Sequence, residues 1–122
     1  MSNKANAIEF LTMAAIGDVS EAFERYVGIE FRHHNPYFAH DRQSLLDAML
    51  LSANDEPNKS FEVIQSFEEN DTVTVHSRLS RVSENAQYAV VHIVRFNNGK
   101  ITELWDLAQA VPIDSPNTLG MF

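Results

Sequence analysis

The period of the apolar residues changes near Lys59, and this change constrains the fold more than any other feature of the sequence. Before it, apolar residues recur with the spacing of amphipathic helices. After it, they alternate with polar residues, as in half-buried strands. Helices followed by strands indicate an α+β domain with the helices packed on one face of the sheet. Because 122 residues suffice for one hydrophobic core, we expect a single domain over residues 1–122.

Three helices are expected before the change of period. The first ends at Gly17, which suits a left-handed C-cap. The second begins after Asp18, which can form a capping box with Glu21, and ends at Gly28. The third begins after Asp41. Its inner side is expected to carry four apolar residues: Leu45, Leu46, Met49 and Leu50.

Five strands are expected. A short strand over residues 29–33 leads into a turn at Pro36, because proline keeps the residue before it out of the helical region. Short connections with turn-forming residues join four longer strands into an antiparallel meander: 60–68, 72–82, 87–97 and 100–111. The residues after Pro112 are expected to form a tail, whose Met121 and Phe122 are able to dock on a partner or at a lip of the domain.

The charge of the chain excludes several classes of partner. Seventeen acidic residues against nine basic ones give a net charge of -8, so nucleic acid and anionic membranes are not expected to bind. The chain has no Cys, which excludes thiol catalysis, thiolate metal sites and disulfides. Glu9 and Thr12 interrupt the N-terminal apolar run, which is therefore a poor signal peptide. A cytoplasmic location is expected.

Two motifs carry a resemblance to a known family: the His-Asn-Pro of HHNPYF (residues 34–36) and the final hairpin, VVHIVRFNNGKITELWDLAQ. With the order of the elements, they make the chain similar to the SnoaL-like family of the nuclear transport factor 2-like superfamily, named for a polyketide cyclase. The resemblance implies a cone-shaped barrel, in which three N-terminal helices pack into a strongly curved antiparallel sheet around an apolar pocket. It also implies homodimers through the outer sheet face and, for the enzymes, proton transfer next to carbonyls or epoxides without a metal or organic cofactor.

His92 and Asp106 are the first candidates for catalysis. His92 lies in an apolar row of its strand, which should face the pocket. A two-residue loop at 98–99 would pair His92 with Trp105, whereas a three-residue loop would pair it with Leu104. Only the second register brings His92 and Asp106 to one face. The resemblance favours this register, because SnoaL-like cyclases have a catalytic Asp and a His at these places.

The chemistry of this pair suits acid-base catalysis. A carboxylate at Asp106, among apolar side chains, loses hydration and becomes a usable base for a carbon acid. His92 can donate a hydrogen bond to the developing oxyanion or hold the second carboxylate oxygen. The alternative is that His92 is a satisfied core histidine and that Asp106 bonds to the backbone or to Trp105.

The segment HHNPYFAHD contains the densest group of possible ligands, His33, His34 and His40 beside Asp41. Adjacent histidines on a strand point to opposite faces, and no carboxylate has a metal-ligand spacing, so no metal is expected. The resemblance places His34 at the pocket entrance, facing inward, where it orients substrate as a third catalytic residue. The alternative is that His34 and Asn35 only shape the turn. Asp41 is expected to cap a helix.

Further residues are candidates for ligand binding. His76 belongs to a polar row that we expect on the outer face, with a pocket role as the alternative. The aromatic residues that either line the cavity or pack in the core are Tyr26, Phe31, Tyr37, Tyr88, Phe96 and Trp105. The candidate ligand-binding set is Asn35, Tyr37, Tyr26, Tyr88, Trp105 and His76.

Three functions are compatible with these residues. The first is a cofactor-independent cyclase, isomerase or lyase acting on a small apolar carbonyl compound, with Asp106 as acid and base assisted by His92 and His34. The second is a noncatalytic protein that binds a small hydrophobic ligand, and the third is a dimeric scaffold. Epoxide hydrolysis is disfavoured, because Arg95 lies on the strand face opposite to His92.

Overall fold

The computed structural model describes residues 2–122. Its helices are α1 (Asn3–Ile16), α2 (Val19–Tyr26) and α3 (Arg42–Asp55), with a short 3-10 turn, η1 (Val82–Glu84). Its strands are β1 (Val27–His33), β2 (Lys59–Glu69), β3 (Thr72–Arg81), β4 (Ala86–Asn97) and β5 (Lys100–Ala110). The α+β class and the four long strands agree with the prediction.

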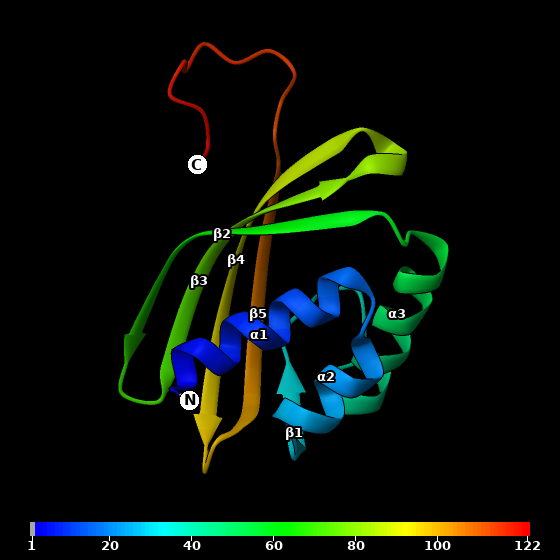
Figure 1. Cartoon of the computed structure of the whole chain (residues 1–122), viewed down its shortest axis with the longest axis vertical. Coiled ribbons are helices and arrows are strands. Elements are labelled where there is room, and N and C mark those ends of the chain that lie inside the picture. Colours follow the sequence, from blue (N-terminus) through cyan, green and yellow to red (C-terminus); the bar gives the residue numbers. More distant parts are fainter. Residues whose placement is uncertain (1) are drawn as a thin grey trace.

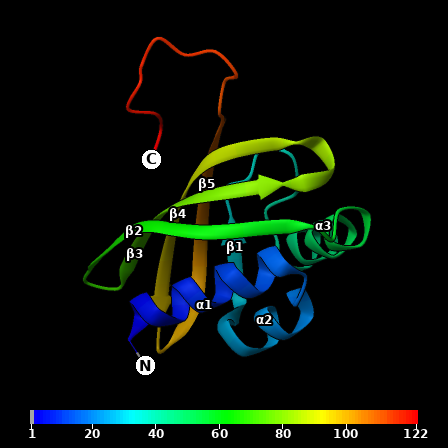
Figure 2. The ribbon, with the colours of Figure 1, turned by 45° about the horizontal axis from the view of Figure 1, so that its top comes forward.

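The strands form one curved sheet in the order β1-β5-β4-β3-β2. The four long strands pair as an antiparallel meander, as predicted, and β1 adds to β5 in the parallel direction. The helices lie together on one side of the bent sheet (Figures 1 and 2). The sheet is strongly curved around the helices, as expected; it is mixed because β1 is parallel to β5, and it is not closed.

Two of the four predicted helix ends, at Gly17 and Asp41, are capped as expected. Gly17 has a φ of 106° and ends α1, and the Asp41 side chain accepts from the Ser44 backbone N–H at the start of α3. Asp18 occupies the N-cap position of α2, but its side chain makes no cap hydrogen bond. The expected capping box is absent because Glu21 pairs with Arg25, one turn along α2.

Gly28 does not end the second helix. That helix ends at Tyr26, and Gly28 lies inside β1, beside β5. A Cβ at Gly28 would lie 3.4 Å from the Ile101 carbonyl oxygen, so the glycine permits the two strands to approach closely. The strand consequently begins two residues earlier than predicted.

The core lies between α1, α2 and the inner sheet face. Its largest fully buried apolar side chains are Phe10, Phe23, Ile101, Val19, Val73, Val75 and Val94. Helix α3 packs beside α2 and β1 at the edge, and of its predicted inner side only Leu45 is fully buried. Leu46 and Met49 pack partly against the core, whereas Leu50 is 39% exposed and was wrongly placed inside.

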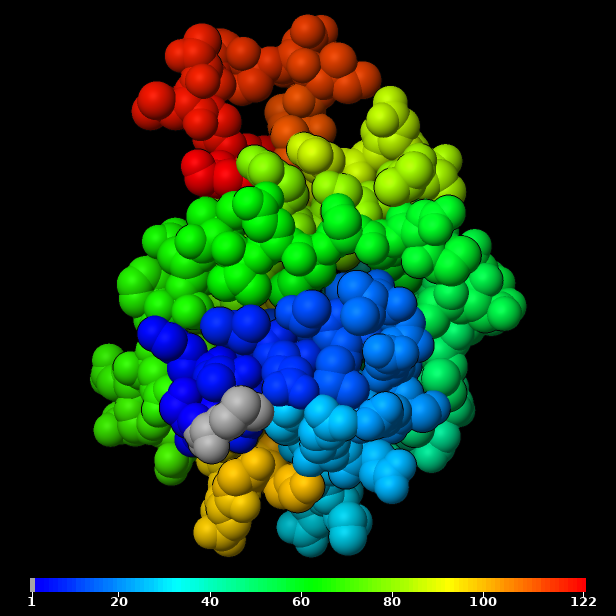
Figure 3. Space-filling view, in the orientation of Figure 1, coloured from blue at the N-terminus to red at the C-terminus, as the bar shows by residue number. Residues whose placement is uncertain are grey.

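The C-terminal tail leaves the end of β5 and turns back toward the rest of the domain (Figures 1 and 3). The ring of Phe122 stacks on His76 with 6.0 Å between ring centres, and the Arg78 guanidinium lies 4.2 Å from the Phe122 ring centre. Phe122 therefore docks on β3 of its own chain, whereas a partner or a lip of the domain was expected. Among residues 2–122, no helix is both long and apolar enough to cross a membrane.

Candidate active site

A bulge in β5 places His92 directly opposite Asp106. The hairpin begins with the two-residue turn 98–99, whose residues both have positive φ. One extra residue, Thr102, then shifts the pairing, so that Arg95 meets Glu103. Both registers considered from the loop length are therefore wrong. The expectation that His92 and Asp106 lie on the same face is right.

Asn35 holds the carboxylate of Asp106. Its Nδ2 donates to Asp106 Oδ2 over 3.0 Å, while its Oδ1 accepts from the backbone N–H of Tyr37 over 2.9 Å. The second bond fixes the orientation of the amide, because only a carbonyl oxygen can accept from that N–H. Asp106 Oδ1 makes no hydrogen bond within residues 2–122, so this oxygen is available to a ligand.

The imidazole of His92 is neutral at physiological pH. Burial lowers its pKa to about 4, although the nearby charge of Asp106 acts in the opposite direction. His92 Nδ1 is buried without a hydrogen-bond partner among the described residues. A neutral ring offers one N–H donor and one acceptor nitrogen, so His92 can donate to a substrate oxygen without first taking up a proton.

The pair lies in the wall of a cavity of about 820 Å³. Helices α1 and α3, the segment 34–38 and the inner face of the four long strands surround it. Its apolar wall includes Leu11, Ala14, Met49, Phe61, Leu79 and Val90, and its polar residues include Asn35, Tyr37, Lys59, Arg81, Tyr88, His92 and Asp106. A cavity of this size and composition suits a small, mostly apolar molecule.

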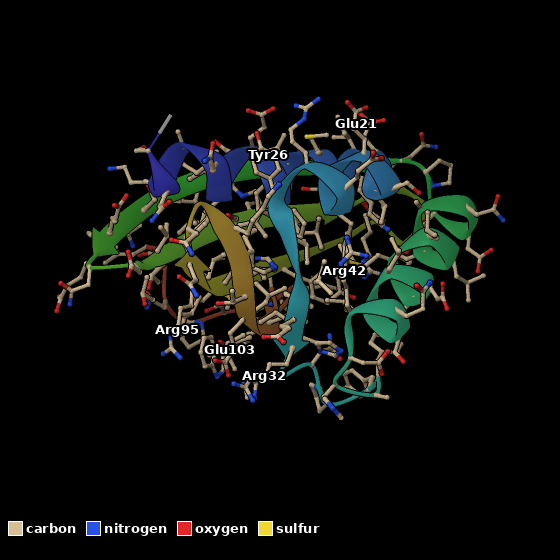
Figure 4. All side chains as sticks on the ribbon, turned by 90° about the horizontal axis from the view of Figure 1, so that it is seen from below. Glu21, Tyr26, Arg32, Arg42, Arg95 and Glu103 are labelled. Carbon is tan, nitrogen blue, oxygen red and sulfur yellow. The ribbon has the colours of Figure 1, made fainter. Side chains whose placement is uncertain are left out.

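A second hollow, of about 900 Å³, lies between α2, β1, α3 and the start of β5. Its lining includes Gly28, Arg42 and Lys100 but none of the candidate residues predicted from the sequence. In the view from below, Arg42 lies between β1 and α3 (Figure 4). We therefore place the candidate active site in the 820 Å³ cavity, where an acid and a base face each other.

Three predicted ligand-binding residues lie outside this cavity. Tyr26 is 5% exposed and belongs to the hydrophobic core. Trp105 lies on the outer face, since it alternates with Asp106 along β5. His76 also lies on the outer face, beneath Phe122, as expected. Asn35, Tyr37 and Tyr88 do line the cavity, whereas Phe31 and Phe96 belong to the core.

Of the two adjacent histidines, His33 and not His34 is the one that points inward. His33 is 3% exposed, and its Nε2 donates to the Ala39 carbonyl while its Nδ1 accepts from the Asn35 backbone N–H. His33 is therefore the inward residue, and it stabilises the turn. His34 reaches the cavity only at its rim, and its ring lies on the outer face, which corrects the inward placement. His33 follows the apolar Phe31 by two positions, and residues two apart on a strand share a face. The sequence could therefore have indicated that His33 points inward.

An outer bracket of four residues, His34, Arg95, Glu103 and Trp105, holds the segment that carries Asn35. His34 Nε2 bonds to Glu103 Oε2 over 2.6 Å, and its ring stacks on Trp105 with 4.7 Å between centres. Arg95 binds the other oxygen of Glu103 over 3.0 Å, and both side chains lie at one edge of the molecule (Figure 4). The hydrogen bond from His34 is the main reason that the pKa of Glu103 is lowered.

The two adjacent histidines of the HHNPYFAHD segment have separate partners. His33 and His34 point to opposite sides of β1, and each bonds to a different partner. Within residues 2–122, no three His, Asp or Glu side chains come together in an arrangement that could hold a metal ion.

Sequence reasoning missed Glu103, Lys59 and Arg81, because nothing in their local spacing distinguishes them from ordinary surface charges.

A family model described as a SnoaL-like domain matches residues 7–104. The chain belongs to the SnoaL-like family. No protein of curated description matches this sequence. Its fold is similar to that of AclR from Streptomyces galilaeus, a protein provisionally described as a hydroxylase, with a TM-score of 0.73 and 18% identity over 88% of this chain and 78% of that one.

Two further solved structures show the same fold. An NTF2-like protein of unknown function from Cytophaga hutchinsonii superimposes with a TM-score of 0.71 and 15% identity, over 89% of this chain and 91% of that one. A SnoaL-like protein from Agrobacterium tumefaciens, provisionally described as an isomerase, gives a TM-score of 0.73 and 12% identity, over 89% and 99%. At these identities the likeness concerns the fold alone.

Proposed function

We propose that this SnoaL-like domain is a cofactor-independent enzyme, a cyclase, isomerase or lyase, that moves a proton next to the carbonyl group of a small compound. One observation carries the proposal: Asp106 and a neutral His92 face each other across two strands in the wall of one cavity. Asn35 takes up one oxygen of Asp106, and His92 Nδ1 has no partner among the described residues, so both groups keep hydrogen-bonding capacity for a ligand.

The proposed reaction begins with a carbonyl compound in the cavity. Asp106 Oδ1 removes a proton from the carbon next to the carbonyl, and the electron pair of the broken C–H bond moves to the carbonyl oxygen. The N–H of His92 donates a hydrogen bond to this enolate oxygen. The protonated Asp106 then returns its proton, to another carbon in an isomerisation or to the new alkoxide after ring closure, which restores the carboxylate.

The other residues of the site position this pair. Asn35 holds Oδ2 of Asp106, so that Oδ1 stays directed to the ligand. His34, expected from the resemblance to assist in catalysis, acts from the outer bracket by holding the backbone on which Asn35 lies. We therefore assign His34 a positioning role in the proposed mechanism.

Deuterium exchange tests this proposal. Incubating the protein in D2O with a panel of apolar ketones should replace hydrogen next to the carbonyl, as followed by proton NMR. Asp106→Asn should lower the exchange rate by about 100-fold or more, because the amide cannot accept the proton. Asp114→Asn, the same change at an exposed aspartate of the tail, should leave the rate unchanged.

The second candidate is a noncatalytic pocket for a small hydrophobic ligand. It is favoured by the largely apolar wall of the cavity and by the bond that already occupies Asp106 Oδ2. Under this reading, ketones of the panel bind saturably, but the wild type and Asp106→Asn both show exchange at the rate of the buffer alone.

We also propose that the protein is a cytoplasmic homodimer, paired through the outer sheet face. That face carries Phe67, 60% exposed, and a hollow of about 670 Å³ whose lining includes Val91, Leu107 and Met121. Exposed apolar side chains gathered on one sheet face are typical of an interaction surface. A dimer that only serves as a scaffold would retain this interface and show neither ligand binding nor exchange.

A further inference from the structure

Two cations lie at the end of the cavity away from His92 and Asp106. Lys59 and Arg81 face each other on β2 and β3, and both line the cavity. On β3, Arg81 follows the residue opposite His92, Val75, by six positions, or about 20 Å along an extended strand. The cavity is therefore apolar in its middle, acid-base at one end and cationic at the other.

The ammonium group of Lys59 has donor capacity left for a ligand. It donates to the side chain and the backbone carbonyl of Ser52, near the end of α3, and an ammonium group has three N–H donors. Burial and the charge of Arg81 lower the pKa of Lys59, and the charge of Glu56 acts in the opposite direction.

Arg81 pairs with two carboxylates but keeps an unbonded donor. Its Nη1 binds Glu56 over 2.7 Å and lies 4.0 Å from Glu84, and Glu56 also accepts from the hydroxyl of Ser83. Arg81 Nε is buried without a hydrogen-bond partner among the described residues. Glu56 does not line the cavity, so the charged residues of the lining are Lys59, Arg81 and Asp106. In a chain with a net charge of -8, this cavity has more positive than negative groups.

We propose that the ligand of this cavity is an amphipathic keto acid, whose carboxylate binds Lys59 and Arg81 while its carbonyl lies at His92 and Asp106. This inference rests on the proposed function for the placement of the carbonyl. A carboxylate accepts charge-assisted hydrogen bonds from Lys59 and Arg81 and offsets their mutual repulsion. The separation along the strands selects a ligand long enough to span the apolar middle of the cavity.

Calorimetric binding to the full chain tests the inference with a series of straight-chain methyl-keto acids of increasing length and the methyl ester of each. The wild type should bind the longer acids about tenfold or more tightly than their esters, and the shorter acids without this preference. The preference should weaken as salt is raised, because the cationic end is partly exposed. Equal affinity for acid and ester at every length would overturn the inference.

Variants separate a ligand contact from a structural role. Lys59→Met should remove the preference for the acid, and Lys59→Arg should retain it, with little change in the affinity for the ester. Lys100→Met is the matched control, because Lys100 also donates to a backbone carbonyl but lies outside this cavity. An acid preference that survives in folded Lys59→Met would contradict the assignment, and the wild-type comparison stands if that variant does not fold.

The outcome is distinguishable from failure of the proposed function. Binding is measured without turnover, so a protein that prefers the acids but catalyses no deuterium exchange keeps this inference and loses the enzymatic proposal. A protein that catalyses exchange on neutral ketones but shows no acid preference loses this inference alone.

Discussion

His92 makes the stability of the fold depend on pH in a defined window. In the unfolded chain its pKa returns to about 6.5, whereas burial lowers it to about 4 in the folded protein. Between these values the unfolded state binds more protons than the folded state, so the free energy of unfolding falls as the pH falls. The contribution of the neutral His92 ring to the free energy of unfolding is fully present above pH 6.5. It is lost progressively as the pH falls toward 4.

The magnitude follows from the size of the shift. One pKa unit corresponds to about 1.4 kcal/mol, so the full shift of His92 corresponds to about 3.5 kcal/mol at most, and roughly 2.5 kcal/mol is lost by about pH 4.5. Other groups also titrate in this range, so the informative quantity is the difference between two proteins. His92→Gln removes the titrating ring and keeps a polar side chain.

Urea unfolding of wild type and His92→Gln at about pH 7.5 and pH 4.5 measures this quantity. We expect the wild type to lose about 2.5 kcal/mol more than the variant over this interval. His40→Gln, which changes an exposed histidine, serves as the control and should follow the wild type. An identical pH dependence in wild type and His92→Gln would refute the claim that His92 is kept neutral by burial.

Two further predictions concern the outer bracket and the outer sheet face. Glu103→Gln should loosen His34, and with it Asn35, so that the deuterium-exchange rate falls about tenfold while urea unfolding changes by less than about 1 kcal/mol. Glu62→Gln, which weakens the surface pair with Arg78, is its control, and an unchanged exchange rate in Glu103→Gln would remove the bracket from the mechanism. Light scattering at micromolar concentration should give twice the mass of one chain, and Phe67→Lys should give a monomer. A monomeric wild type would disprove the dimer.

The layout of the fold was predictable because local signals agreed with the global arrangement. The change of period at Lys59 separated helices from strands, and the caps at Gly17 and Asp41 set two helix boundaries. Strand parity also indicated that Arg95 lies on the face opposite to His92. Gly28 misled the prediction, because a glycine that permits close strand packing resembles, in sequence, a glycine that ends a helix.

The candidate site was predictable only in part. The two residues His92 and Asp106 were identified, but the bulge at Thr102 that places them opposite each other has no sequence signature that distinguishes it from a regular strand. Lys59 and Arg81 meet through the pairing of two strands, and Glu103 meets His34 across 69 positions of the chain. Long-range meetings of this kind depend on register, which a single sequence specifies weakly.

The most direct test of the account is a crystal structure with the most tightly bound ketone of the panel. We expect the carbonyl oxygen within about 3.2 Å of a His92 ring nitrogen, and the neighbouring carbon within reach of the oxygen of Asp106 that Asn35 leaves free. A ketone that lies elsewhere in the molecule, or in this cavity with its carbonyl directed away from both residues, would contradict the assignment of His92 and Asp106 as the reacting pair.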